Sequence, residues 1–186
     1  IDGRLIGGVF LVAFCLMNLY GARKAADLQV GLTLMLLLLL GGFIVMGAPA
    51  VEARNFTPFV PKGWRSIFST AGFVFVAFGA AMQVASTAEE IKDPGRNIPW
   101  GIGLSIITVT VLYMAVVGVA TGVMPADRLD SSMTPVSDAA AAFLPRSGVI
   151  AVSIGGLLAF LTTANAGIMT ASRYLLALSE DKLAPR

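Results

Sequence analysis

Residues 77–99 read AFGAAMQVASTAEEIKDPGRNIP and join an apolar segment to a charged one. The part before residue 89 is uncharged and rich in small side chains, with Gly79 and Gln83 near its middle. Five charged residues then fall within eight positions: Glu89, Glu90, Lys92, Asp93 and Arg96. A long uncharged segment that ends abruptly in charge is typical of a helix that leaves a membrane. The stretch therefore predicts a membrane-spanning helix and the polar loop after it.

The composition also favours a membrane protein. Of the 186 residues 56% are hydrophobic and 13% are charged, whereas soluble domains carry about 25% charged residues. The net charge of +2 gives no indication of a nucleic-acid partner. The chain has no histidine, which excludes Ser-His-Asp catalysis and histidine metal sites. We therefore expect neither an enzyme nor a protein with a metal or cofactor, and the lone Cys15 cannot form an internal disulfide.

Five segments are long and apolar enough, or nearly so, to cross a bilayer, which takes about 20 residues. They are residues 5–20, 28–46, 67–88, 98–123 and 149–171. We expect all five to belong to a single membrane domain. Because the chain begins at Ile1 and stops after Pro185, we expect it to be a fragment of a longer protein.

The loops suggest an orientation and one further helix. Lysine and arginine are densest in the short loops that contain Lys24 and Lys92, so these loops are expected in the cytoplasm. The protein would then be a multi-pass protein of the plasma membrane. Residues 134–145, TPVSDAAAAFLP, predict a short helix across the outer face, with Thr134 as N-cap, Pro135 at the first position and Pro145 as its stop.

The third segment has an unusual composition for a helix that faces lipid. Its mixture of aromatic, glycine and small polar residues allows a helix to break near Gly79. A broken helix is tolerated in a membrane only where it lines a cavity, and there it presents carbonyl groups to a cation and amide groups to an anion. The alternative is a small-residue seam between two packed helices, which composition alone favours.

Residues 88–99 resemble the loop after the sixth helix of the amino acid–polyamine–organocation permeases, whose pattern is Ala-Glu-Glu-x-Lys-x-Pro-x-Arg-x-x-Pro. The matching residues are Ala88, Glu89, Glu90, Lys92, Pro94, Arg96 and Pro99. Residues 164–185, ANAGIMTASRYLLALSEDKLAP, are similar to the eighth helix of that family and its following loop. The positions of Asn18, Gly21, Lys24 and Gln29 are similar to the turn between helices four and five.

The resemblance implies that the chain forms helices four to eight of about twelve. The fold would be all-α, part of an inverted-repeat, LeuT-like arrangement of five plus five helices. The implied function is secondary active transport of amino acids, or related amines, by alternating access. The other helices of the permease would be its partners, together with the lipid bilayer. A different class stays open: a non-transporting membrane sensor or assembly subunit on the same scaffold.

The resemblance also implies a substrate site where the sixth helix unwinds. The candidate substrate-binding residues are Val76, Ala77, Phe78, Gly79, Ala80 and Met82. The backbone of Phe78, Gly79 and Ala80 would accept the amino group, and Val76 and Met82 would shape a small apolar pocket. Some family members carry an acidic residue at the position of Met82, and this chain does not.

The candidates for gating and ion coupling are less specific. Glu89, Glu90, Lys92 and Arg96 would position a cytoplasmic gate, or simply pair with one another at the membrane surface. Proton-coupled members can carry a lysine where this chain has Met35 or Leu36, and no ionisable residue lies within the five segments. This disfavours proton coupling through this part. Thr162 and Thr163 are candidates for a sodium site, although helical hydroxyls more often bond their own backbone. Exchange, proton symport and sodium symport all stay open.

Overall fold

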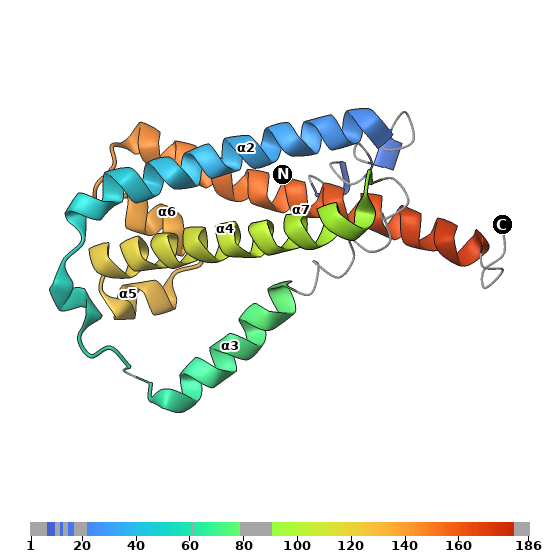
Figure 1. Ribbon diagram of the computed structural model, residues 1–186. Coiled ribbons are helices and arrows are strands. Elements are labelled where there is room, and N and C mark those ends of the chain that lie inside the picture. Colours follow the sequence, from blue (N-terminus) through green and yellow to red (C-terminus); the bar gives the residue numbers. More distant parts are fainter. Residues whose placement is uncertain are drawn as a thin grey trace.

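The computed structural model describes residues 7–9, 12, 15–16, 22–60, 62–78 and 91–180, and every regular element within these residues is helical. Three elements are long helices that form a bundle: α2 (Ala22–Gly47), α4 (Pro94–Val123) and α7 (Arg146–Glu180). A fourth helix, α3 (Trp64–Phe78), stands apart from them (Figure 1). The short elements are η1 (Ala48–Ala50), η2 (Ala53–Phe56), α5 (Ala126–Ser131) and α6 (Pro135–Ala140).

Three of the described helical segments are long and apolar enough to cross a membrane. They are Ala26–Ala50, Pro94–Val123 and Arg146–Tyr174. At 1.5 Å per residue a helix of 30 residues is about 45 Å long, more than the hydrocarbon core of a bilayer. The prediction of an all-α membrane protein is thereby confirmed.

The two remaining predicted spans are only partly described. Helix α3 covers residues 67–78 of the third span, and residues 79–88 lie outside the described part of the chain. Six residues of the first span are described, all in helical conformation. The division into five spans therefore stays a prediction.

The bundle is held together mainly by α7, which packs along α2 (Figure 1). Because α2 and α7 run in opposite directions, the end of α2 lies near the start of α7. The short elements gather at this end, which we call the capped end. Here the aromatic rings of Phe43 and Phe143 lie 5.4 Å apart, centroid to centroid. The core of the described residues lies at this end, between α2, α4 and α6.

Helix α6 closes the core because its side chains are small. Ala139 and Ala140 are fully buried, and α6 packs against both α4 and α7. The sequence predicted a longer helix lying across the outer face. The observed helix is shorter and inserts between its neighbours, because alanine permits a close approach. Thr134 is the N-cap residue, but its side chain does not cap the helix; its hydroxyl instead lies 3.4 Å from a carboxylate oxygen of Asp138.

The loop after α2 docks onto the end of α4 through one carbonyl group. The oxygen of Gly122 accepts a hydrogen bond from the Glu52 amide at 2.9 Å and another from Asn55 Nδ2 at 2.7 Å. Beyond this loop, Lys62 forms an ion pair with Asp130 of α5. These contacts fix the chain at the capped end just before α3 begins.

Candidate substrate-binding segment

The described part of the candidate substrate site lies in the last turn of α3. Val76, Ala77 and Phe78 belong to this helix, whereas Gly79, Ala80 and Met82 lie outside the described residues. The side chain of Val76 is 75% exposed. The structure therefore places half of the predicted substrate residues on one helix, and the break near Gly79 stays a prediction.

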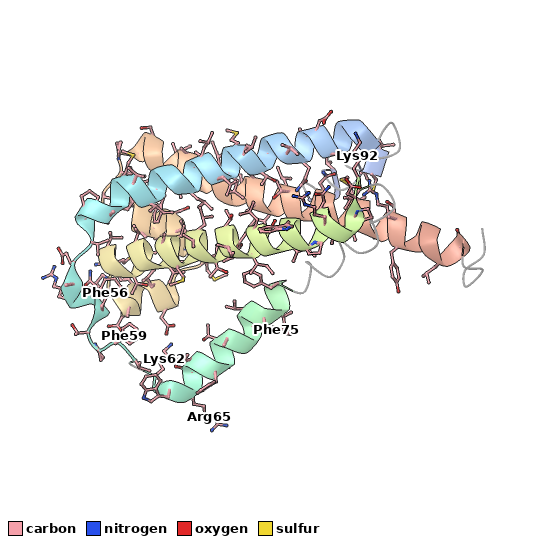
Figure 2. All side chains as sticks on the ribbon, viewed as in Figure 1. Phe56, Phe59, Lys62, Arg65, Phe75 and Lys92 are labelled. Atoms are coloured by element: carbon pink, nitrogen blue, oxygen red, sulfur yellow. The ribbon has the colours of Figure 1, made fainter. Side chains whose placement is uncertain are left out.

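Helix α3 carries a large apolar surface that the rest of the described chain leaves uncovered. Trp64, Phe68, Phe73 and Phe75 are all mostly exposed, and α3 makes few contacts with the other described elements. Figure 2 shows Phe75 on this isolated helix. Large apolar side chains that are left exposed on a helix suit a lipid or protein environment and not water. The surface of α3 is thus compatible with a helix inside a membrane domain.

The charged stretch gives α4 its first turn. Asp93 adopts a left-handed conformation with φ of 47°, and its carbonyl oxygen accepts hydrogen bonds from the amides of Arg96 and Asn97, both at 3.0 Å. Asn97 also donates through Nδ2 to the carbonyl of Lys92 at 2.5 Å. Pro94 lacks an amide hydrogen and therefore suits the first helical position.

The residues predicted to position a gate are only partly described. Lys92 is exposed at the end of the bundle opposite the capped end (Figure 2). Arg96 is exposed in the first turn of α4. Glu89 and Glu90 lie outside the described residues. Among the residues that the structure describes, no group of three histidine, cysteine or carboxylate side chains could hold a metal ion.

The two threonines considered for sodium lie on different faces of α7. Thr162 is 7% exposed and shares the buried face with Val152, Gly155, Leu158 and Asn165. Thr163 is exposed. Both hydroxyls donate to the Ala159 carbonyl, at 3.0 and 2.8 Å. The bonds are of the kind that helical threonines usually make, and the sodium site stays a prediction.

Sequence reasoning missed a polar pair between two membrane helices. Asn165 of α7 is fully buried, and its Nδ2 donates to Oε1 of Gln29 in α2 at 3.0 Å. Both residues lie within the stretches that carried the family resemblance, but the pairing needs the antiparallel packing of α2 on α7. The sequence feature that could have indicated the pair is an amide side chain in each of two apolar segments, at similar depth in the predicted membrane.

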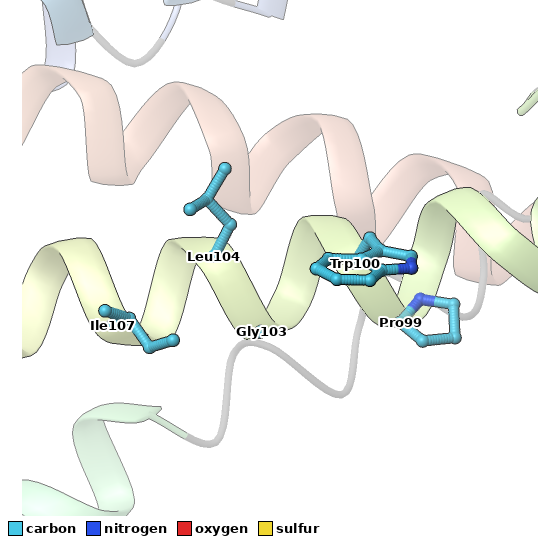
Figure 3. A pocket seen from close by; sticks show the side chains of 5 residues that line it. All are labelled: Pro99, Trp100, Gly103, Leu104 and Ile107. Carbon is cyan, nitrogen blue, oxygen red and sulfur yellow. The ribbon is translucent and has the colours of Figure 1, made fainter.

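An apolar groove lies on α4 (Figure 3). Its volume is about 260 Å³, and it is lined by Pro99, Trp100, Gly103, Leu104 and Ile107. Small-molecule sites combine apolar walls with a few polar groups that orient the ligand. The five lining residues lie in one helical segment and carry no charge, and the groove contains none of the predicted site residues.

Comparison with known proteins gives matches along the whole chain. The family model described as amino acid permease matches residues 1–186. The branched-chain amino acid permease BcaP of Bacillus subtilis (strain 168) is 32% identical over 88% of the chain and 35% of its own length. Cationic amino acid transporter 9, chloroplastic, of Arabidopsis thaliana is 29% identical over 98% of the chain and 32% of its own length.

A third relative is named as a transporter of a different compound. The methylthioribose transporter of Bacillus subtilis (strain 168) is 30% identical over 98% of the chain and 41% of its own length. The chain thus spans between a third and two fifths of the length of the curated relatives it matches.

Proposed function

Because the chain belongs to the amino acid permease family, within the amino acid–polyamine–organocation superfamily, we propose that it is part of a secondary active transporter of amino acids or related compounds. The observation that carries this proposal is the family match over all 186 residues. Relatives named for branched-chain amino acids, cationic amino acids and methylthioribose support a small polar metabolite as substrate. The three span-length helices support transport across a membrane.

The proposed binding site lies at residues 76–82, where α3 leads into the part of the chain that is not described. An amino acid carries a cationic and an anionic group. An unwound membrane helix can meet both, because its freed carbonyls face the amine and its free amides face the carboxylate. The backbone of Phe78, Gly79 and Ala80 takes the amino group in this proposal. Val76 and Met82 contact the substrate side chain.

The remaining parts of the proposal concern the surroundings of this site. Glu89, Glu90, Lys92 and Arg96 position the cytoplasmic gate, with Lys92 and Arg96 exposed at that end of the bundle. The protein is an integral membrane protein, and we place it in the plasma membrane, although some relatives are named for chloroplast or vacuole. The helices that complete the permease are its partners.

Exchange is the favoured mode of transport. The middle of α2 carries Met35 and Leu36 where a lysine would support proton coupling, and intramembrane ionisable residues are what marks a proton path. One-for-one exchange of amino acids across the membrane needs no imposed ion gradient. Thr162 and Thr163 keep sodium coupling as the second candidate.

The test uses the whole protein that contains this chain, purified and reconstituted in liposomes. The vesicles are loaded with unlabelled leucine, arginine or methylthioribose, and uptake of the same labelled compound is followed without a pH gradient. We expect counterflow for at least one amino acid. Strict dependence on a pH gradient would contradict the exchange mode, and absence of transport for all compounds under proton and sodium gradients would favour the sensor or assembly subunit.

A further inference from the structure

A partly buried hydrogen bond between two uncharged side chains joins α2, near the start of its candidate membrane span, to α7. Asn165 Nδ2 lies 3.0 Å from Gln29 Oε1 and 3.8 Å from the sulfur of Met169. The two residues are 136 positions apart in the chain. The bond therefore reports how two distant segments pack.

The burial of Asn165 makes a hydrogen-bond partner for its side chain necessary. Asn165 has no exposed surface even within this chain, and the buried residues that precede it on the same face of α7 are Thr162 and Leu158. An amide in such a place needs a partner, because an unsatisfied polar group in an apolar environment is costly. Rotating α7 or sliding it by one residue would remove Asn165 from Gln29.

The same helix pair is closely packed further toward the capped end. A Cβ atom added at Gly155 would lie 3.6 Å from Leu39 Cβ and 3.4 Å from Leu39 Cδ1. Gly155 is buried, and it lies ten residues before Asn165 on the same face of α7. The interface thus has a polar contact and a small-residue contact, about 15 Å apart along the helix at 1.5 Å per residue.

We propose that the Gln29–Asn165 hydrogen bond is a positioning contact that fixes the register of α2 against α7, so that these two helices act as one unit during transport. Small residues bring membrane helices close but leave them able to slide, whereas a directed hydrogen bond between them fixes one register. Buried polar residues set register in this way in other helix assemblies. The inference rests on the proposed transport function.

The first test separates positioning from simple stability. Gln29→Met keeps the chain length of glutamine and Asn165→Leu keeps the branching of asparagine, and each removes one amide. Each single variant removes one partner of the Gln29–Asn165 hydrogen bond and should lower the melting temperature. The double variant replaces both partners with apolar side chains of similar size, so the melting temperature should largely recover.

Exchange in liposomes should not recover with it. We expect the double variant to exchange amino acid roughly tenfold more slowly than the wild type, equivalent to about 1.4 kcal/mol, with unchanged substrate affinity. A double variant that exchanges at the wild-type rate would show that the pair serves stability alone and would overturn the proposal.

The second test does not depend on these variants folding. Cysteines in place of Leu39 and Gly155 should form a disulfide, because a Cβ–Cβ distance of 3.6 Å lies within the disulfide range. Cys15→Ser serves as background. If α2 and α7 act as one unit, exchange persists after oxidation. Exchange that stops on oxidation and returns on reduction would show that the helices must move past each other, which contradicts the proposal. If the uncross-linked protein does not transport at all, the proposed function fails, while the melting curves still test the pairing.

Discussion

Gly122 of α4 lies close to side chains of the loop that follows α2. A Cβ atom at this position would lie 2.6 Å from Val51 Cγ1 and 3.2 Å from Phe56 Cζ. The carbonyl of the same residue accepts two hydrogen bonds from the loop, through Glu52 and Asn55. Only glycine leaves room here for the loop to reach the carbonyl.

We predict that replacement by alanine changes the stability of the protein in opposite directions at two glycines of α4. Gly122→Ala forces the loop away and should destabilise the protein by roughly 1–3 kcal/mol. Gly118→Ala is the matched control, because nothing lies within 4 Å of its added Cβ, and alanine is favoured over glycine in helices by up to about 1 kcal/mol. Thermal unfolding of the purified protein in detergent measures both. Equal melting temperatures for the two variants would contradict the docking described above.

For single residues, the sequence indicated those that are unusual in their local context, but not those that matter through contacts with distant residues. Gly79 attracts notice because it interrupts an apolar segment next to charge. Gly122 and Asn165 do not, because their importance arises from residues 67 and 136 positions away. Only the antiparallel packing of the helices brings those partners together.

The elements at the capped end are joined by two kinds of contact that differ in strength. Asn55 donates to a backbone carbonyl in a partly buried position. Lys62 pairs with both oxygens of Asp130 at 2.8 and 2.7 Å, but the two side chains are 65% and 67% exposed. Exposed ion pairs contribute about 0–1 kcal/mol and are screened by salt.

We predict that the hydrogen bond matters more than the ion pair. Asn55→Leu should lower the free energy of unfolding by about 1 kcal/mol at any salt concentration. Lys62→Met should cost less than about 1 kcal/mol, and the cost should fade in high salt. Unfolding at low and high salt measures both variants. The reverse ranking, or an effect of Asn55→Leu that fades with salt, would contradict this view.

Hydrophobic segments located the long helices but not all of their boundaries. Helices α2 and α4 end at Gly47 and Val123, within one residue of the ends of the predicted spans. Helix α4 begins at Pro94, four residues before the predicted span, because Asp93 and Pro94 supply a turn and a first helical position. Helix α7 continues to Glu180, nine residues beyond the predicted span. Apolar content marks what lies in the membrane, whereas local turn chemistry decides where a helix starts and stops.

The described loops of the molecule lie at the two opposite ends of the helix bundle. Residues 48–60, α5 and α6 lie at the capped end, and the first residues of α2 and α4 lie at the other (Figure 1). Many large apolar side chains of the long helices are exposed on the bundle, as expected of helices in contact with lipid or with further helices.

For the whole molecule, we predict which loops face the cytoplasm and which face the outside. Single cysteines in place of Lys24 and Asp93, in a Cys15→Ser background, should react with a membrane-impermeant reagent only from the cytoplasm. Cysteines in place of Asn55 and Ser132 should react only from outside. Labelling in intact and in opened cells measures this. Reaction of both pairs from the same side would contradict the five-span arrangement.

The family and fold class could be predicted from the sequence because the motif of residues 88–99 and the apolar segments are local features. The chain belongs to a LeuT-like, all-helical membrane fold, as expected. The packing of α6 into the core and the Gln29–Asn165 pair could not be predicted, because they depend on how separate helices approach. The site at residues 76–82 rests on the resemblance and on the chemistry of an unwound helix.

The most direct test is amino-acid binding to the whole permease with valine in place of Gly79. Valine is β-branched and would put two methyl groups where a substrate amine meets carbonyls, while the segment stays apolar enough to insert. Gly72→Val is the matched control, because Gly72 lies in α3 with nothing within 4 Å of its added Cβ. Labelled amino-acid binding and yield of monodisperse protein are measured on the same preparations. We expect the wild type and Gly72→Val to bind amino acid, and well-folded Gly79→Val not to bind it. Normal binding by well-folded Gly79→Val would contradict the proposed site at residues 76–82.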